Sequence, residues 1–244
     1  MQNIRNFNSF IQEDINIVDG ELVFNDIQGI KTAFGKGSNL SPFTKKVPDT
    51  DMISYSLYQA KKATPILKAL KDANFKSDES VRQFVNRSAV YGFRILRKMD
   101  IDIIVAPLSS SLLTREFAQQ IQKRSNYDFY LDSFRKTADI SRVGINRNDP
   151  RITDQIIKSM EKTIARAQKN GFISVKQFAP QHRKFITNLF EIIDDKLYQK
   201  VNDRNVVIID DIMTSGTTSK QIYDELKTHG ANQITTLTLF KASS

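Results

Sequence analysis

Runs of apolar residues mark the strands that this chain is expected to form. Ile101–Ala106 and Val206–Ile209 are rich in β-branched residues, which is typical of strands buried on both faces of a parallel sheet. Gln233–Phe240 predicts a further strand, and Tyr127–Leu131 predicts a short one between the first two. These strands lie far apart in the sequence, so long connections must join them.

Apolar residues at helical spacing fill most of these connections. In Ser77–Met99 the apolar side chains fall near one face of a helix, which predicts a helix packed on a core. Further helices are predicted at Ser54–Lys71 with a break at Pro65, at Leu112–Arg124, at Asp149–Ala167, from Pro180 onward and at Ser219–Thr228, whereas Lys196–Asn205 is predicted to be a polar turn. The alternation predicts an α/β fold, a Rossmann-like parallel sheet flanked by helices.

The first 50 residues are less regular than the rest. Ile15–Val18 and Leu22–Phe24 predict a short hairpin around Asp19-Gly20, and the glycines and prolines after it indicate a loop made basic by Lys36, Lys45 and Lys46. We expect residues 1–50 to form an N-terminal extension or hood element. Residues 51–244 are expected to form one domain with a helical insertion near 149–171.

Composition narrows the classes of site. The formal net charge of +9 and the pI of about 9.6 suit anionic partners, either nucleic acid or phosphorylated small molecules, although a lysine-rich solvated surface has the same charge. The chain has no cysteine and two histidines, which excludes disulfides and makes a zinc site improbable. No apolar run has membrane-spanning length and no signal-peptide core is present, so a cytoplasmic protein without membrane contact is expected.

The segment Asn205–Ser219 combines three features that together predict a phosphate site. Asp210 and Asp211 follow the Val206–Ile209 strand, and Thr214, Ser215, Gly216, Thr217 and Thr218 then form a hydroxyl-rich turn that leads into a helix. A helix N-terminus offers free N–H groups and a favourable dipole to an anion, and glycine lets the backbone approach it. The two carboxylates suit hydroxyls or a cation beside the phosphate.

Each feature alone would also fit a polar strand end and a helix cap, so the joint pattern carries the prediction. A second strand-turn-helix follows Ile101–Ala106, where the turn is Pro107, Leu108, Ser109, Ser110 and Ser111, with Arg115 one turn into the helix. This turn taken alone is equally well explained as structural. Glycine-rich nucleotide loops of the P-loop and dinucleotide-binding types are absent from the sequence.

The Val206–Thr218 segment resembles the phosphoribosyl-pyrophosphate (PRPP) signature of type I phosphoribosyltransferases. The resemblance implies that Asp210 and Asp211 meet the ribose hydroxyls and that Thr214–Thr218 wrap the 5-phosphate. It also implies that Pro107, Leu108, Ser109, Ser110 and Arg115 belong to the pyrophosphate loop. The reaction implied is displacement of pyrophosphate from PRPP, in which Mg²⁺, near Asp210 and Asp211 directly or through water, would neutralise the leaving group.

Other parts of the chain are similar to the ComF-type, competence-associated branch of that family. The branch carries Pro-Leu and then Arg-Gly-Phe-Asn-Gln, where this chain has Pro107-Leu108 and Arg115-Glu116-Phe117-Ala118-Gln119. Lys136-Thr137 and the group Gln181, Arg183, Asn188 and Phe190 are similar to two further segments, with imperfect spacing. The four-cysteine zinc element of many members cannot exist in a chain without cysteine.

Basic residues on other segments are candidates for closing over the pyrophosphate. They are Lys136, Arg142 and Arg183, and each taken singly is better explained as a solvated surface charge. The acceptor that attacks PRPP cannot be read from the sequence. We expect a phosphoribosyltransferase. The alternatives are a PRPP-binding regulator without chemistry and a nucleic-acid-associated protein, and a homodimer is a further expectation.

Overall fold

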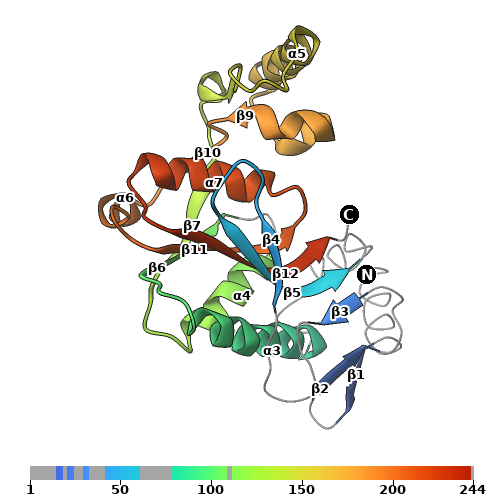
Figure 1. Cartoon of the computed structure of the whole chain (residues 1–244), viewed down its shortest axis with the longest axis vertical. Helices are drawn as coiled ribbons and strands as arrows, with labels where there is room; N and C mark the ends of the chain where they lie inside the picture. Colours follow the sequence, from blue (N-terminus) through green and yellow to red (C-terminus); the bar gives the residue numbers. More distant parts are fainter. Residues whose placement is uncertain are drawn as a thin grey trace.

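The computed structural model describes three short strands before residue 42, and then residues 42–60, 79–108 and 112–242. Within these residues, eight strands form one sheet in the order β10-β7-β6-β11-β12-β5-β3, with β4 paired to β5 (Figure 1). Their bounds are β3 Ile30–Thr32, β4 Phe43–Lys46, β5 Ile53–Ala60, β6 Ile103–Pro107, β7 Asp128–Lys136, β10 Phe190–Ile192, β11 Val206–Met213 and β12 Ile234–Ala242.

The central strands β7, β6, β11, β12 and β5 are parallel, and antiparallel strands flank them. Helices cover both faces of the sheet, and Val206–Ile209 in the central strand β11 is buried throughout. The expected α/β fold with a Rossmann-like parallel sheet is therefore confirmed.

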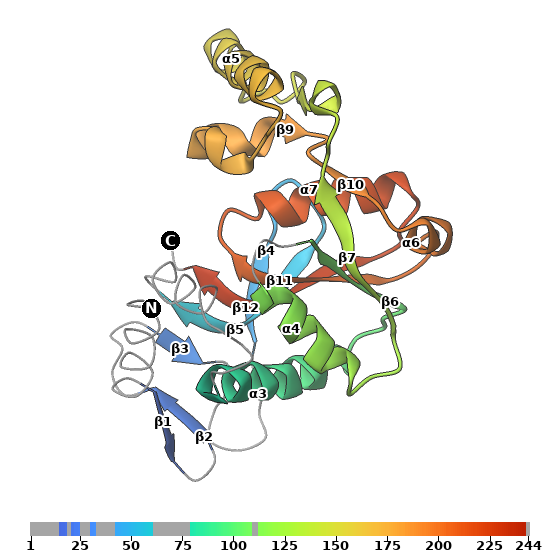
Figure 2. The same ribbon diagram turned by 180° about the vertical axis from the view of Figure 1, so that it is seen from behind.

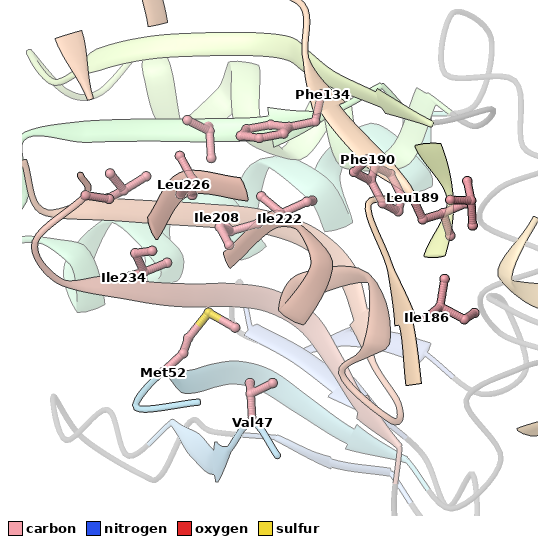
Figure 3. Packing of buried hydrophobic residues seen from close by; sticks show 14 of the residues in the cluster. Val47, Met52, Phe134, Ile186, Leu189, Phe190, Ile208, Ile222, Leu226 and Ile234 are labelled. Carbon is pink, nitrogen blue, oxygen red and sulfur yellow. The ribbon is translucent and has the colours of Figure 1, made fainter. Parts of the chain in front are cut away.

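Two apolar clusters fill the space between the sheet and its helices. Helices α3 (Glu79–Leu96) and α4 (Leu112–Gln122) bury their apolar faces against one side of the sheet, together with Val207 and Ile209. On the other side, α6 (Asp195–Lys200) and α7 (Thr217–Thr228) pack around Ile208 with Leu197, Ile222 and Leu226 (Figure 3). Alternate residues of β11 thus point into opposite clusters, as a strand requires.

Residues 137–189, which we call the insertion module, lie between β7 and β10. The module contains η1 (Ile140–Arg142), β8 (Gly144–Ile145), α5 (Asp154–Asn170), η2 (Val175–Gln177), η3 (Pro180–Phe185) and β9 (Ile186–Thr187). It stands beyond α7 at one end of the molecule (Figure 2). Thr153 caps the start of α5 by accepting from Ile156 N–H, and Gly171, in the left-handed conformation at φ 64°, ends it.

The part of the chain before residue 61 forms two hairpins, the first a separate two-stranded sheet and the second part of the eight-stranded sheet. β1 (Ile15–Val18) and β2 (Glu21–Phe24) form the expected antiparallel hairpin. β4 and β5 form a second hairpin, whose tip is Val47–Met52 and which is closed by a hydrogen bond from Val47 N–H to the Met52 carbonyl. None of the helices in the described part of the chain has the length and apolar character that crossing a bilayer requires.

Several predicted elements differ from the structure. The helix predicted at Ser54–Lys71 is wrong over its first part, because Ile53–Ala60 is strand β5 with Ser54 and Ser56 buried in the sheet. The strand at Tyr127–Leu131 continues to Lys136 in β7, and the polar turn predicted at Lys196–Asn205 contains part of α6. Helix α5 begins at Asp154, five residues after the predicted start.

Candidate functional site

The two acidic residues of the predicted phosphate site lie within β11. The strand runs on to Met213, four residues beyond the predicted end at Ile209, because β12 continues to pair with it. Pairing with β6 on the other side covers Val206–Ile208, so both acids lie past that ladder. Asp211 is 4% exposed, and Asp210 is partly buried. The Asp210 Oδ1 atom accepts a hydrogen bond of 2.8 Å from the Asp211 N–H.

The side-chain alternation of β11 shifts by one residue across the acid pair. Val207 and Ile209 belong to the apolar cluster beneath α3 and α4, and strict alternation would add Asp211 to it. Instead, Ile212 packs against that cluster, and Met213 belongs to the opposite one. The partly buried Ile212 therefore contacts the cluster beneath α3 and α4, whereas the buried Asp211 is not a member of it.

The hydroxyl-rich turn joins β11 to α7. Thr214 and Ser215 are exposed, Gly216 has φ 78°, and α7 begins at Thr217, two residues earlier than predicted. The hydroxyls of Ser215 and Thr217 lie 2.9 Å apart. No side chain caps the N-terminus of α7 at Gly216, so the turn presents hydroxyls and helix N–H groups where an anion is favoured.

The space beside Gly216 is filled by protein. A Cβ atom at this position would lie 3.0 Å from Val47 Cγ1 and 3.3 Å from Met213 Sδ, with Pro48 Cδ at 3.7 Å. Val47 is fully buried, and it joins the cluster beneath α7 (Figure 3). The glycine therefore serves the left-handed backbone and the close approach of the β4–β5 hairpin. The expectation that Gly216 lets the backbone approach a phosphate stays a prediction.

The structure describes the start of the second predicted turn, Pro107 and Leu108. β6 ends at Pro107, and the exposed Leu108 donates its N–H to the Phe134 carbonyl at 2.7 Å. The pairing of β6 with β11 ends at Val105 and Ile208, so Pro107 and Asp210 each follow this pairing by two residues on neighbouring strands. Ser109 and Ser110 lie outside the described residues.

Arg115 lies in the first turn of α4 and contacts β7. Its guanidinium is 3.5 Å from the carboxylate of Asp132, and its side chain is half exposed. Asp132 has φ 57° and lies where the β6–β7 register shifts. The structure therefore places Arg115 on the helix that follows the second turn, with an exposed ion pair that a charged ligand can compete for.

The other candidate basic residues have partners in or near the insertion module. The Lys136 Nζ atom lies 5.8 Å from the centre of the Phe172 ring, and burial, followed by repulsion from Lys176, lowers the pKa of Lys136. The Arg183 Nε group donates to the Phe178 carbonyl at 3.1 Å. These contacts link both residues to the module, and none of them joins either residue to the hydroxyl-rich turn.

Glu191 on β10 was not singled out by the sequence and organises the base of the module. It accepts from Arg135 at 2.8 Å, from the Thr137 hydroxyl at 3.2 Å and from Arg142 at 3.3 Å. Burial alone would raise the pKa of Glu191, but the hydrogen bonds from Arg135 and Thr137 outweigh it and hold the pKa below its ordinary value. Arg142 is thus held at β10.

Lys45 on β4 was noted in the sequence only as part of a basic stretch. Its Nζ atom donates a hydrogen bond of 2.9 Å to the carbonyl of Thr214, the first residue of the hydroxyl-rich turn. The signal that could have found β4 is its alternation, since Phe43 and Lys45 are partly buried while Thr44 and Lys46 are exposed. The partner of Lys45, however, is 169 residues away in the sequence.

Solved structures similar to this chain include three phosphoribosyltransferases. The purine phosphoribosyltransferase from Pyrococcus horikoshii is 13% identical, with a TM-score of 0.35 over 64% of this chain and 81% of that one. A hypoxanthine phosphoribosyltransferase from Staphylococcus aureus is 13% identical, with a TM-score of 0.36 over 66% of this chain and 64% of that one. A hypoxanthine-guanine phosphoribosyltransferase from Bacillus anthracis is 15% identical, with a TM-score of 0.35 over 66% and 65%. The chain thus spans just under two thirds of the last two.

A search of curated proteins finds no match to the chain. The family model described as the phosphoribosyl transferase domain matches residues 98–244, which is more than half of the chain. The matched residues include β6, α4, the insertion module, both acids and the whole hydroxyl-rich turn. The chain therefore belongs to the phosphoribosyl transferase domain family.

Proposed function

We propose that this protein is an Mg²⁺-dependent phosphoribosyltransferase that binds PRPP and transfers its ribose 5-phosphate group to an acceptor. The observation that carries the proposal is the junction of β11 and α7, where two acids precede an uncapped helix N-terminus rich in hydroxyls. The family match covers this junction. The closer relation to the ComF-type branch stays a prediction.

Each part of the junction has a separate role in this proposal. The turn Thr214–Thr218 holds the 5-phosphate through helix N–H groups and hydroxyls, while Asp210 and Asp211 accept from the ribose hydroxyls. Residues 107–110 and Arg115 receive the pyrophosphate, which leaves as the bond to the anomeric carbon breaks. Neutralising that leaving group is the main task of catalysis, and Lys136, Arg142 and Arg183 are the candidates to help close the site.

Asp210 and Asp211 fit a magnesium site in which the substrate and water supply most of the ligands. Among the described residues, no cluster of three or more His, Cys, Asp or Glu could hold a metal by itself. Mg²⁺ commonly uses one or two carboxylates and takes its other ligands from phosphates and water, which the pair Asp210 and Asp211 matches. When bound, the ion would supply positive charge to the pyrophosphate. Acceptor specificity is expected from residues 149–171, within the insertion module, or from residues 1–50.

Calorimetry with PRPP and with ribose 5-phosphate, each with and without Mg²⁺, tests the binding site. We expect both ligands to bind and Mg²⁺ to strengthen PRPP binding. Release of pyrophosphate from PRPP across a panel of nucleobases then separates an enzyme from a regulator that only binds. Absence of binding for both ligands contradicts the proposal, and binding without turnover for any acceptor favours the regulator.

A second candidate function, nucleic-acid binding, is favoured by the charge on α5. Its exposed residues Lys158, Lys162, Arg166 and Lys169 follow one another at intervals of four, four and three, which puts them on one helix face. Among the described residues, none of these four has a recorded ion pair. The module holds ten lysines and arginines against four acids, so it carries +6 of the net charge of +9. Such a row suits a phosphate backbone.

Gel-shift titrations with single-stranded DNA at several salt concentrations, with and without PRPP, test this candidate. The triple variant K158Q/K162Q/K169Q should bind at least tenfold more weakly and with a smaller salt dependence, because fewer counterions are released. The control K98Q/K123Q/K196Q removes the same charge from exposed lysines outside the module. Equal losses in the two triple variants would show that only net charge matters.

A further inference from the structure

Lys45 brings a positive charge to the hydroxyl-rich turn from outside the matched domain. It lies on β4, more than 50 residues before the matched region begins at residue 98. β4 pairs with β5 and β5 pairs with β12, so two strands, β5 and β12, separate β4 from β11 in the sheet. The Lys45 ammonium therefore reaches the carbonyl of Thr214, at 2.9 Å, from the side of the turn opposite β6.

The tip of the hairpin fixes this approach. Val47 is fully buried and packs close to Gly216, with Pro48 beside it. The Thr50 hydroxyl donates to the Val47 carbonyl at 2.9 Å and accepts from the Met52 N–H at 3.1 Å, which closes the turn. With the tip held against the turn, Lys45 two residues earlier is held near Thr214, whereas Lys46 lies on the exposed face of the strand.

The Lys45 ammonium can donate further hydrogen bonds besides the one to Thr214. A lysine ammonium has three N–H donors, and the Thr214 carbonyl accepts one of them. Within the part of the chain that the structure describes, no carboxylate is recorded in an ion pair with Lys45. The side chain is partly buried, whereas its hydrogen bond to Thr214 is exposed, so the attraction between the ammonium and a bound anion is expected to weaken with added salt.

We propose that Lys45 is a phosphate ligand of the turn Thr214–Thr218. The ammonium keeps its bond to the Thr214 carbonyl and directs a second N–H to a phosphate oxygen. This inference rests on the proposed function, because the phosphate is the one that the turn would hold. It extends the site to β4, so the β4–β5 hairpin becomes part of ligand binding as well as part of the sheet.

Titration calorimetry of inorganic phosphate and of ribose 5-phosphate, at low and high salt, tests the role of Lys45. K45Q should bind both ligands about ten- to hundredfold more weakly, the loss expected for one charge-assisted hydrogen bond. Its salt dependence should also decrease, because one positive charge is gone. K45R should stay within a few-fold of the wild type. The control K46Q removes a neighbouring charge that points away from the turn and should leave affinity unchanged.

Three outcomes would overturn the inference. Unchanged phosphate affinity in K45Q means that Lys45 does not touch the ligand. Equal losses in K45Q and K45R, with an unchanged salt dependence, mean that the lysine only shapes the turn through Thr214. If the wild type binds neither ligand, the proposed function fails and this inference fails with it. If the wild type binds both ligands and K45Q binds them with unchanged affinity, only this inference fails and the proposed function stands.

Discussion

Asp49, at the tip of the β4–β5 hairpin, accepts a hydrogen bond of 2.8 Å from Arg151 in the insertion module. Arg151 also donates to both carboxylate oxygens of Asp149, at 2.8 and 2.6 Å, and these bonds hold the pKa of Asp149 well below its usual range. The hairpin tip thus contacts the module through Asp49 and the hydroxyl-rich turn through Val47. The tip of the β4–β5 hairpin therefore connects the insertion module to the hydroxyl-rich turn.

Removing this link should loosen the hairpin more than it destabilises the protein. In R151Q we expect the Val47 N–H, which bonds to the Met52 carbonyl, to exchange with deuterium about two- to fivefold faster, as suits the loss of an exposed ion pair. The control R147Q loses the exposed pair with Glu161, which lies wholly inside the module. Faster hairpin exchange in both variants would show that Arg151 has no specific role.

The two acids and the turn should be separable by ligand. D210N and D211N should each weaken ribose 5-phosphate binding by roughly ten- to hundredfold, because asparagine offers a weaker, uncharged acceptor to the sugar hydroxyls. Inorganic phosphate should lose little affinity, since it meets only the turn. Calorimetry with both ligands measures this, with D128N at the far end of β7 as control. Equal losses for the two ligands would mean that the acids merely hold the turn in shape.

Gly216→Ala should destabilise the fold through two separate effects. An alanine at φ 78° is strained by about 1–2 kcal/mol, and its Cβ would lie 3.0 Å from Val47. Gly171→Ala is the matched control, because it has φ 64° and nothing within 4 Å of the added Cβ. Urea denaturation should show a larger loss for G216A than for G171A. The double variant V47A/G216A should show whether the excess comes from the hairpin contact.

The hydrogen bonds of Glu191 make a pH-dependent contribution to stability. Its folded-state pKa lies below the unfolded value, so the ionised carboxylate stabilises the protein above the unfolded pKa, and this is lost as pH falls through the folded pKa. E191Q should therefore be less stable than the wild type by about 1 kcal/mol at pH 7, and the difference should shrink towards pH ~3. Denaturation at both pH values measures it, with the exposed Glu161→Gln as control. A difference independent of pH would contradict the role of charge.

Gln221 on α7 forms hydrogen bonds with the last residues of the insertion module. The side chain is 3% exposed, donates to the Ile186 carbonyl and accepts from the Leu189 N–H at 3.1 Å. Q221M keeps the size of the side chain and leaves two buried backbone groups without that partner, so we expect a loss of about 2 kcal/mol in the free energy of unfolding. Q168M, at an exposed position on α5, should be nearly neutral. Comparable losses would mean that the buried bonds contribute little.

The parts of the fold that the sequence predicted are those with local signals. β6, β11 and β12 stand out as apolar runs, α3 as a periodic stripe, and the phosphate site as a contiguous segment. Strand β5 was missed because its buried positions include the small polar residues Ser54 and Ser56, so Ile53–Ala60 has no apolar run like those of β6 and β11. Its serines are buried only because β12, about 180 residues later, pairs with it. Pairing with the distant strand β12 therefore makes residues 53–60 a strand, which local sequence patterns do not specify.

Contacts between residues far apart in the sequence also explain which parts of the candidate site were missed. The two acids and the turn could be found from the sequence because they are adjacent in it. The contact between Lys45 and Thr214 depends on sheet order, which no pattern near either residue specifies. Glu191 gathers Arg135, Thr137 and Arg142 only because β10 turns back along β7. Residues 61–78 and 109–111 lie outside the described residues, so predictions that fall on them stay predictions.

The region matched by the family model is shorter than the region that packs together in the structure. The matched region starts at residue 98, yet β12 is covered along one side by β5 and beneath by α3, and both precede that residue. A recombinant fragment cut at residue 98 would turn the mostly buried β12 into an open edge with unpaired backbone groups. Such an edge recruits strands from other molecules, so a shortened protein is expected to self-associate even though every residue of the signature is present.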